Sequence, residues 1–205
     1  MILDYIKNNY QIGEPIFLED LPCNSKDYLR QEMKKLVDEG KLDRFTNGVY
    51  FIPFKTFPNG GGLSITKYVN RKYIRGKDNK DKGILTGLSL LNRYGFTTQN
   101  PSVIEVCSND ATTKQRTINV EGFKVIVYKP IVEINNKNKG ALEFLELMSV
   151  IDESSEFRGV KLMNKIKEYI KECNVDFNEV KEYLPYYPAK VYKNIYKVGL
   201  MKEII

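Results

Sequence analysis

The sequence of 205 residues contains no histidine. This absence removes the commonest general base, the commonest zinc ligand and every serine or cysteine nucleophile that depends on an imidazole. The cysteines, Cys23, Cys107 and Cys173, are single and far apart, so they form neither a CxxC metal pair nor an even disulfide framework. We interpret them as buried structural thiols in a protein of the reducing cytoplasm, since free cysteine behaves mainly as a small apolar residue.

Long apolar runs and phosphate-binding motifs are missing as well. No apolar run approaches the ~18 residues that span a bilayer, and Asp4 and Lys7 interrupt the N-terminal apolar spacing that a signal peptide would need. There is no GxxxxGKS/T loop and no GxGxxG fingerprint. Gly60–Gly62 lacks a following lysine at the right spacing, so it indicates a linker. Glu143 and Glu146, at i and i+3, offer too few oxygens for a divalent cation. We therefore expect no metal, no cofactor, no membrane segment and no enzymatic activity.

Positive charge is concentrated in the middle of the chain. The formal net charge is +6, and residues 56–130 carry +7, whereas the flanking parts carry −1 and 0. Between Lys67 and Lys82, seven Lys and Arg side chains face only Asp78 and Asp81. A basic segment of this kind favours an anionic partner.

The first 55 residues show three helical patterns. Ile2, Leu3 and Ile6 are spaced as one apolar helical face. A second short helix is expected around Phe17 to Leu21, ended by Pro22. A third is expected from about Ser25 to Glu39, with a cap at Asn24 or Ser25. The apolar stripe of this third helix comprises Leu29, Met33, Leu36 and Val37.

A β-hairpin follows, because Asn47-Gly48 precedes the strand-like run Val49 to Ile52. Asn-Gly is the strongest short hairpin signal, since both residues tolerate the positive φ of a type I′ turn. Three helices and a hairpin predict a winged helix-turn-helix, in which the third helix enters the major groove and the hairpin holds phosphates. The expected DNA-binding side chains on these two elements are Lys26, Arg30, Gln31, Lys34, Arg44 and Asn47.

The same segment is open to a different interpretation. Winged helices also serve as protein-interaction modules, and this one is slightly acidic, with Asp38, Glu39 and Asp43 close to the expected DNA surface. Its exposed cations would then form an ordinary solvated helix face.

Beyond residue 55 the composition predicts a linker and a second domain. Thr56 to Leu63 is rich in glycine and separates a winged-helix domain of residues 1–55 from a domain of residues 64–205. In the second domain we expect short helices at about Ser64–Tyr73 and Ile84–Tyr94, around an exposed basic loop. Three strands are then predicted at Val103–Ser108, Thr117–Val120 and Phe123–Tyr128. Helices follow from Asn138 to about Val198, so we expect an α+β protein with a small antiparallel sheet and a helical C-terminal part.

Several short segments occur in a characteristic order along the chain. Gly48-Val49-Tyr50-Phe51-Ile52-Pro53 closes the hairpin, and the run from Leu85 to Pro101 contains Gly95-Phe96-Thr97-Thr98-Gln99-Asn100-Pro101. Lys129-Pro130, Ala141 to Leu145 and Tyr187 to Lys190 follow. Over nearly the whole chain, this pattern resembles the antitoxins of the AbiE abortive-infection family, which belong to type IV toxin-antitoxin systems.

The resemblance implies a winged-helix domain that represses its own operon by binding operator DNA. It also implies a C-terminal domain that counteracts a nucleotidyltransferase-like toxin, without the need for a stable complex. The family's hairpin commonly carries several basic residues, whereas Asp43 to Asn47 contains only Arg44. We therefore expect Arg71, Lys72 and Arg75 to supply further phosphate contacts, with a solvated loop as the alternative.

The sequence thus predicts a cytoplasmic, DNA-binding antitoxin that represses its own transcription. The alternative is a winged-helix protein-interaction module without operator binding. An enzyme acting on nucleic acid is a third and weaker interpretation.

Overall fold

The computed structural model describes residues 2–54, 62–120 and 122–204, except for the side chain of Glu153. Its helices and strands form two compact units, Met1–Lys72 and Tyr73–Ile205, so the chain is a mixed α and β protein. Among the described residues, no helix is long and apolar enough to cross a bilayer.

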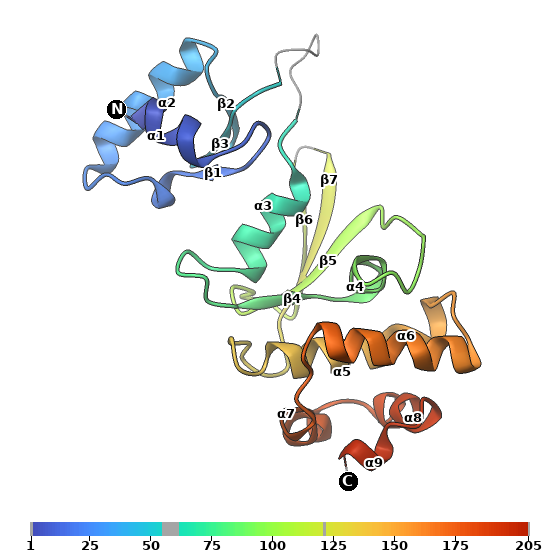
Figure 1. Ribbon diagram of the computed structural model, residues 1–205. Helices are drawn as coiled ribbons and strands as arrows, with labels where there is room; N and C mark the ends of the chain where they lie inside the picture. The colour runs from blue at the N-terminus through green and yellow to red at the C-terminus, as the bar shows by residue number, and fades with distance from the viewer. Residues whose placement is uncertain (1, 55–61, 121, 205) are drawn as a thin grey trace. The chain divides into compact units, whose positions relative to one another are not determined.

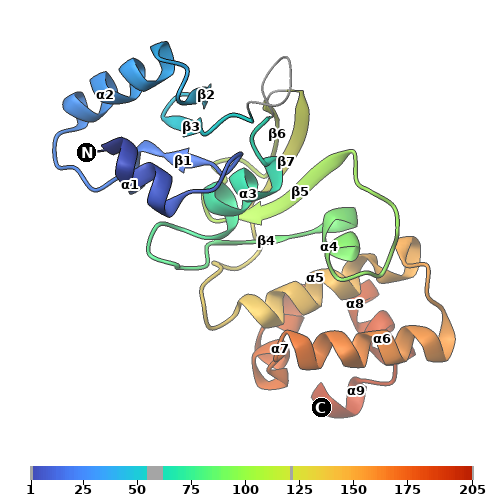
Figure 2. The same ribbon diagram turned by 45° about the horizontal axis from the view of Figure 1, so that its top comes forward.

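Residues 2–54 of the first unit form two α-helices and a small sheet (Figures 1 and 2). Helices α1 (Ile2–Asn9) and α2 (Lys26–Asp38) are separated by strand β1 (Ile16–Phe17) and a single 3-10 turn, η1 (Leu18–Asp20). Strands β2 (Asp43–Thr46) and β3 (Val49–Phe51) form a hairpin. The three strands pair antiparallel in the order β1-β3-β2. The predicted first helix, third helix and hairpin are therefore confirmed.

One apolar stripe of α2 organises the core of the first unit. Leu29, Met33 and Leu36 are each at most 4% exposed, as their helical spacing predicts. Ser25 caps the helix, since its Oγ accepts a hydrogen bond from the N–H of Tyr28 at 3.4 Å. Other elements complete this core with Ile6, Ile16, Leu21, Leu42 and Tyr50.

The second helix predicted around Phe17 to Leu21 is wrong. Phe17 is extended and pairs with Val49 of β3, so only η1 is helical. Leu21 is also extended, with φ −78° and ψ 140°, because proline disfavours helical backbone in the residue before it. Pairing with the hairpin therefore overrides the local helical pattern.

The turn of the β2–β3 hairpin depends on Gly48, whose φ is +74°. Asn47 is not among the described non-glycine residues with positive φ, so the expected type I′ turn is wrong. The register shifts between Arg44, which pairs with Tyr50, and Thr46, which pairs with Val49. A left-handed glycine beside such a bulge is typical of a longer hairpin loop.

Residues 63–72 belong to the first unit, although the sequence predicted a domain boundary at Thr56–Leu63. They form α3 (Ile65–Val69), which continues as a π turn, η2 (Asn70–Ile74). Tyr68 is 1% exposed, stacks on Phe17 at 5.9 Å and meets Phe45 edge-on at 5.1 Å between ring centroids. These ring contacts hold the segment on the first unit. Residues 56–61, which make up most of the predicted linker, lie outside the described residues.

Gly13 joins the chain on both sides of that linker. Its N–H donates to the carbonyl oxygen of Ile52 at 2.9 Å, and its own carbonyl oxygen accepts from the N–H of Ser64 at 2.8 Å. Ile52 and Ser64, on the two sides of residues 53–63, therefore both bind Gly13.

The second unit is built on a four-stranded sheet in the order β4-β5-β7-β6 (Figure 1). These strands span Gly83–Leu85 (β4), Val103–Ser108 (β5), Gln115–Val120 (β6) and Phe123–Tyr128 (β7). β6 and β7 pair antiparallel, as expected for neighbouring strands of an antiparallel sheet, and Glu121 between them lies outside the described residues. β4 was not expected, because its residues were assigned to a loop and a helix.

The prediction of a purely antiparallel sheet is wrong, because β5 and β7 are parallel. Val125 and Val127 of β7 are fully buried, whereas the positions of β6 before Val120 alternate between exposed and partly buried. The more apolar strand therefore occupies the interior of the sheet, next to β5. The chain reaches β7 only after it has passed along the edge as β6, and β7 then runs in the direction of β5.

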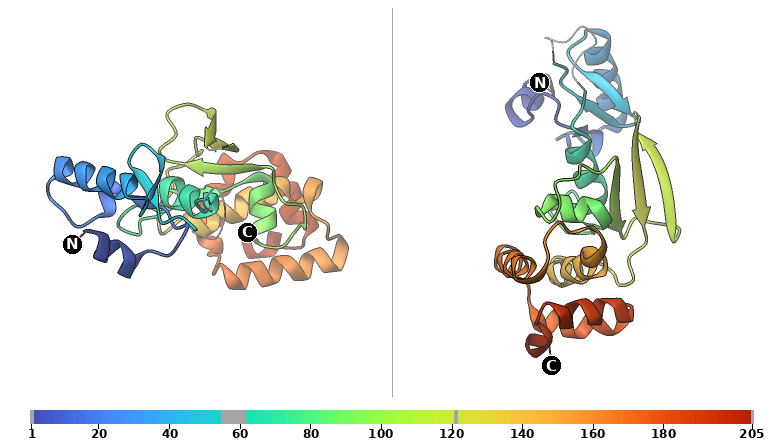
Figure 3. Two further views of the ribbon diagram at one scale, coloured as in Figure 1. Left: turned by 90° about the horizontal axis from the view of Figure 1, so that it is seen from above. Right: turned by 90° about the vertical axis from the view of Figure 1, so that its right-hand side faces the viewer.

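Helices cover the sheet in layers (Figures 1 and 3). α4 and α5 pack next to the sheet, α6 lies beside α5, and α7, α8 and α9 form a further layer. The bounds are Gly87–Arg93 (α4), Lys139–Ser154 (α5), Gly159–Glu172 (α6), Phe177–Tyr183 (α7), Ala189–Lys197 (α8) and Met201–Ile204 (α9), with a 3-10 turn η3 at Leu184–Tyr186. The predicted helices are confirmed, and α9 is additional. Asp176 caps α7, since its Oδ1 accepts the N–H of Asn178 at 2.8 Å.

Candidate nucleic-acid interface

A concavity of about 420 Å³ lies between α2 and the β2–β3 hairpin of the first unit. Its apolar part is formed by Leu18, Val37 and Tyr50. The polar and charged residues that line it are Arg30, Lys34, Asp38, Arg44 and Asn47. Four of the six residues that the sequence predicted to contact DNA on α2 and the hairpin therefore meet in one place.

The α2 side of the concavity presents residues four apart. Arg30, Lys34 and Asp38 share a helix face because this spacing is close to one helical turn. Arg30 Nη1 donates to Asp27 Oδ1 at 2.9 Å, and both side chains remain largely exposed. Among the described residues, no side-chain hydrogen bond or ion pair involves Lys34 or Asp38.

The hairpin side presents one further cation. Arg44 Nη2 donates to Asn47 Oδ1 at 3.0 Å, so a neutral amide holds this guanidinium. The carbonyl oxygen of Gly48 accepts the N–H of Leu18 at 2.9 Å, which ties the hairpin turn to η1. The two remaining predicted residues, Lys26 and Gln31, are exposed on α2 but do not line the concavity.

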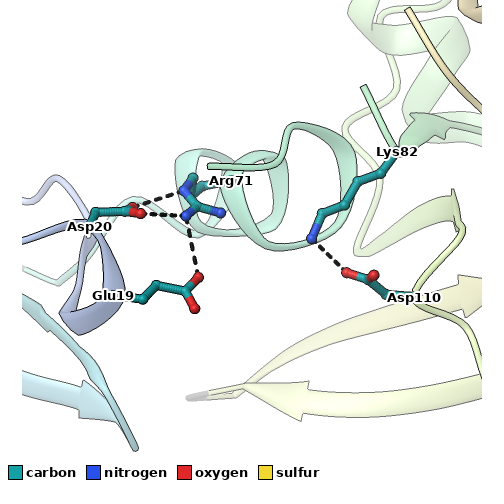
Figure 4. Close-up of polar contacts among 5 residues, drawn as sticks. All are labelled: Glu19, Asp20, Arg71, Lys82 and Asp110. Carbon is teal, nitrogen blue, oxygen red and sulfur yellow. Dashed lines mark hydrogen bonds and ion pairs between the residues drawn. The ribbon is translucent and has the colours of Figure 1, made fainter. Parts of the chain in front are cut away.

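The basic segment between Lys67 and Lys82 is largely paired with neighbouring groups, as Figure 4 shows for two of its cations. Arg71 donates to Asp20 through Nε at 2.9 Å and through Nη2 at 2.5 Å, and its Nη2 lies 3.3 Å from Glu19 Oε1. The Arg71 side chain is 20% exposed and lies over the ring of Phe17, 4.9 Å from the centroid. Its guanidinium is thus engaged with carboxylates, in contrast to the phosphate contact that we predicted.

Other cations of this segment are also engaged. Lys72 Nζ donates to the hydroxyl of Tyr68 at 2.7 Å, and Lys67 Nζ lies 3.7 Å from Glu14 Oε1. In the second unit, Lys82 Nζ contacts Asp110 Oδ2 at 2.6 Å. Arg75, the third predicted phosphate contact, is exposed.

In the second unit, the run from Leu85 to Pro101 is secured by four glutamates. The sequence singled out only Glu143 and Glu146, and these were considered as metal ligands, not as partners of this segment. Thr86 Oγ1 donates to Glu146 Oε2 at 2.6 Å, and the hydroxyl of Tyr94 donates to Glu143 Oε2 at 3.2 Å. At the start of α4, Glu105 Oε2 accepts the N–H of Leu88 at 3.3 Å. Glu156 Oε1 accepts the N–H of Thr98 at 2.7 Å and the hydroxyls of Thr97 and Thr98 at 2.9 and 2.8 Å. This distinctive segment is therefore held in place by carboxylates.

The pKa values of three of these carboxylates are shifted, and not all in the same direction. Burial raises the pKa of Glu143, which is 8% exposed, and burial also raises the pKa of Glu146. Hydrogen bonds from the backbone and hydroxyl of Thr98, and from the hydroxyl of Thr97, lower the pKa of Glu156. The described residues contain no group of three or more His, Cys, Asp or Glu side chains arranged to hold a metal ion.

The cysteines are all free. Cys107 is buried, and burial raises its pKa, as expected of a structural thiol. Cys23 and Cys173 are only partly buried, which differs from the prediction.

No model of a protein family matches the sequence, and a comparison with curated proteins finds no match.

Proposed function

We propose that the first unit is a winged helix-turn-helix that binds double-stranded DNA through the concavity between α2 and the β2–β3 hairpin. The observation that carries this proposal is the convergence of Arg30, Lys34, Arg44 and Asn47 on one concave surface. A helix flanked by a hairpin can place side chains in the major groove while the hairpin reaches the sugar-phosphate backbone. The order of helices and strands in this unit supports the proposal.

The charge distribution supports a binding surface of limited size. Residues 1–72 contain eleven Lys and Arg and nine Asp and Glu, so the unit carries only +2. Glu19 and Asp20 are already paired with Arg71, whereas Lys34 has no counterion among the described residues. Lys34 and Arg44 of the concavity are therefore available to phosphates even though the unit is nearly neutral.

We further propose that the chain is an AbiE-type antitoxin, which represses its own operon and counteracts a nucleotidyltransferase-like toxin. This part rests on the resemblance of the segments named above. The toxin would be a functional partner, with or without a stable complex. A nucleotidyltransferase gene beside the gene of this protein, and relief by this protein of the growth arrest that its product causes, would test it directly.

The alternative, a protein-interaction module without operator binding, is favoured by one observation. Asp38 lies among the cations of the concavity, where its charge opposes phosphate. A measurement of DNA binding by the intact protein distinguishes the two functions, because only the first requires it.

The experiment is a gel shift at several salt concentrations on DNA from upstream of the gene. Each phosphate contact adds about 0.9 to the slope of log affinity against log salt. Lys34→Ala and Arg44→Ala should each weaken binding and lower this slope by about one phosphate contact. Lys35→Ala is the matched control, because Lys35 is exposed on α2 but does not line the concavity. Equal effects of all three variants, or no binding by the wild type, would contradict the proposal.

A further inference from the structure

Arg30 differs from the other cations of the concavity in being paired with a carboxylate. Its Nη1 donates to Asp27 Oδ1 at 2.9 Å, and the side chains of Arg30 and Asp27 are 63% and 87% exposed. The guanidinium carries five N–H donors, so most of its donors remain free for a ligand. Both residues lie in the first half of α2, which begins at Lys26 behind the cap of Ser25.

We propose that Asp27 orients Arg30 as a reader of guanine in the major groove and keeps it away from phosphate. This inference rests on the proposed DNA-binding function. The N-terminal half of a recognition helix is the part that contacts base edges. Arginine recognises guanine there by donating to O6 and N7, and this pairing is the commonest specific contact in protein–DNA complexes.

The negative charge of Asp27 favours a base over a phosphate as the ligand of Arg30. A phosphate bound to Arg30 would bring a second anion close to the Asp27 carboxylate, and two like charges about 4 Å apart repel even in water. The guanine edge is neutral, so it accepts from Arg30 without this repulsion. The carboxylate also fixes the plane of the guanidinium before DNA arrives, which lowers the entropy cost of binding.

Arg44 provides the contrast within the same concavity. It is held by the neutral side chain of Asn47, at 3.0 Å, so nothing in that pair repels a phosphate. Arg44 is therefore suited to contact the phosphates of DNA, and Arg30 is suited to contact a base. Asp27 acts as a positioning residue that raises the preference for one sequence over all others.

The test begins with selection of duplexes from a random library by the intact protein. Each guanine of the selected site is then replaced by 7-deazaguanine, which lacks the N7 acceptor. Affinities of the wild type and of Arg30→Ala, Asp27→Asn and Asp38→Asn are measured on the selected, deaza-substituted and random duplexes.

We expect one guanine position at which the deaza substitution weakens the wild type about tenfold and leaves Arg30→Ala unchanged. Asp27→Asn should bind random DNA more tightly and lose part of the preference for the selected site. Asp38→Asn is the matched control, because it removes the same charge from α2 but no contact with Arg30. It should raise the affinity for both duplexes by a similar factor.

Two outcomes would overturn the assignment while leaving DNA binding intact. One is that Arg30→Ala weakens selected and random duplexes equally and no guanine position depends on Arg30. The other is that Asp27→Asn behaves as Asp38→Asn does. If the wild type enriches no sequence and shows no salt-dependent binding, the proposed function itself fails.

Discussion

Gly87 and Glu105 depend on each other at the start of α4. Gly87 has a φ of +57°, and a Cβ built on it would overlap the Glu105 carboxylate. That carboxylate accepts the N–H of Leu88 at 3.3 Å and the hydroxyl of Tyr128 at 3.1 Å. A residue with a side chain at position 87 would therefore strain the backbone and also displace the acid that caps the helix.

We expect Gly87→Ala to destabilise the protein by more than the roughly 1–3 kcal/mol typical of left-handed backbone strain. Gly122→Ala is the control, because Gly122 also has a positive φ, +82°, but has no atom within 4 Å of a built Cβ. Denaturant unfolding of both variants measures the difference. Equal losses of stability would show that the Glu105 contact contributes nothing.

At the scale of helices and strands, the segments with strong local signals were predicted correctly. The apolar stripe of α2 and the glycine of the β2–β3 hairpin fix those elements by themselves. Three features depend on contacts between residues far apart in the sequence: β4, the parallel pairing of β5 with β7, and the position of α3. The spacing of apolar residues along the chain contains no information about such contacts. Ile84 of β4, for example, pairs with Cys107 of β5, and Tyr68 of α3 packs on Phe17.

The same distinction applies to the candidate site. Helical spacing was sufficient to place Arg30 and Lys34 together, and the hairpin signal placed Arg44 near them. Arg71 was assigned to phosphate because its partner Asp20 lies 51 residues away in the sequence. The residues next to Arg71 in the sequence include no acid, whereas the fold brings the carboxylates of Glu19 and Asp20 to its guanidinium.

The packing of α3 predicts where the first unit can be cut. We expect a fragment of residues 1–72 to fold, and a fragment of residues 1–55 to be less stable by several kcal/mol. The shorter fragment exposes the surface that Tyr68 covers on Phe17 and Phe45, and it leaves Glu19 and Asp20 without Arg71. Circular dichroism during heating tests this, and equal melting temperatures would contradict it.

At the scale of the whole molecule, acids whose pKa values are shifted in opposite directions make the stability of the fold depend on pH in opposite ways. Burial raises the pKa of Glu143, so its folded form binds a proton more tightly than the unfolded chain. The resulting stability is present below the unfolded pKa of about 4.5 and is lost as pH rises through the folded value. The pKa of Glu156 is lowered, so its contribution is present above the unfolded value and is lost as pH falls.

We therefore expect Glu143→Gln to gain stability relative to the wild type as pH rises above about 4.5, because the amide carries no charge to bury. Glu156→Gln should be most destabilising at neutral pH and close to neutral in effect in acid. Unfolding curves at a series of pH values measure both. Parallel pH profiles for the two variants would contradict the opposite shifts.

The two hydrogen bonds of Gly13, to Ile52 and to Ser64, have a consequence for how the chain tolerates changes in length. They make residues 53–63 a closed excursion within the first unit, and the chain passes to the second unit only after Lys72. The entropy of closing a flexible loop grows with the logarithm of its length, by about 0.6 kcal/mol for each doubling. We therefore expect insertions between Ile52 and Ser64 to cost little stability, because both ends of this interval stay bound to Gly13.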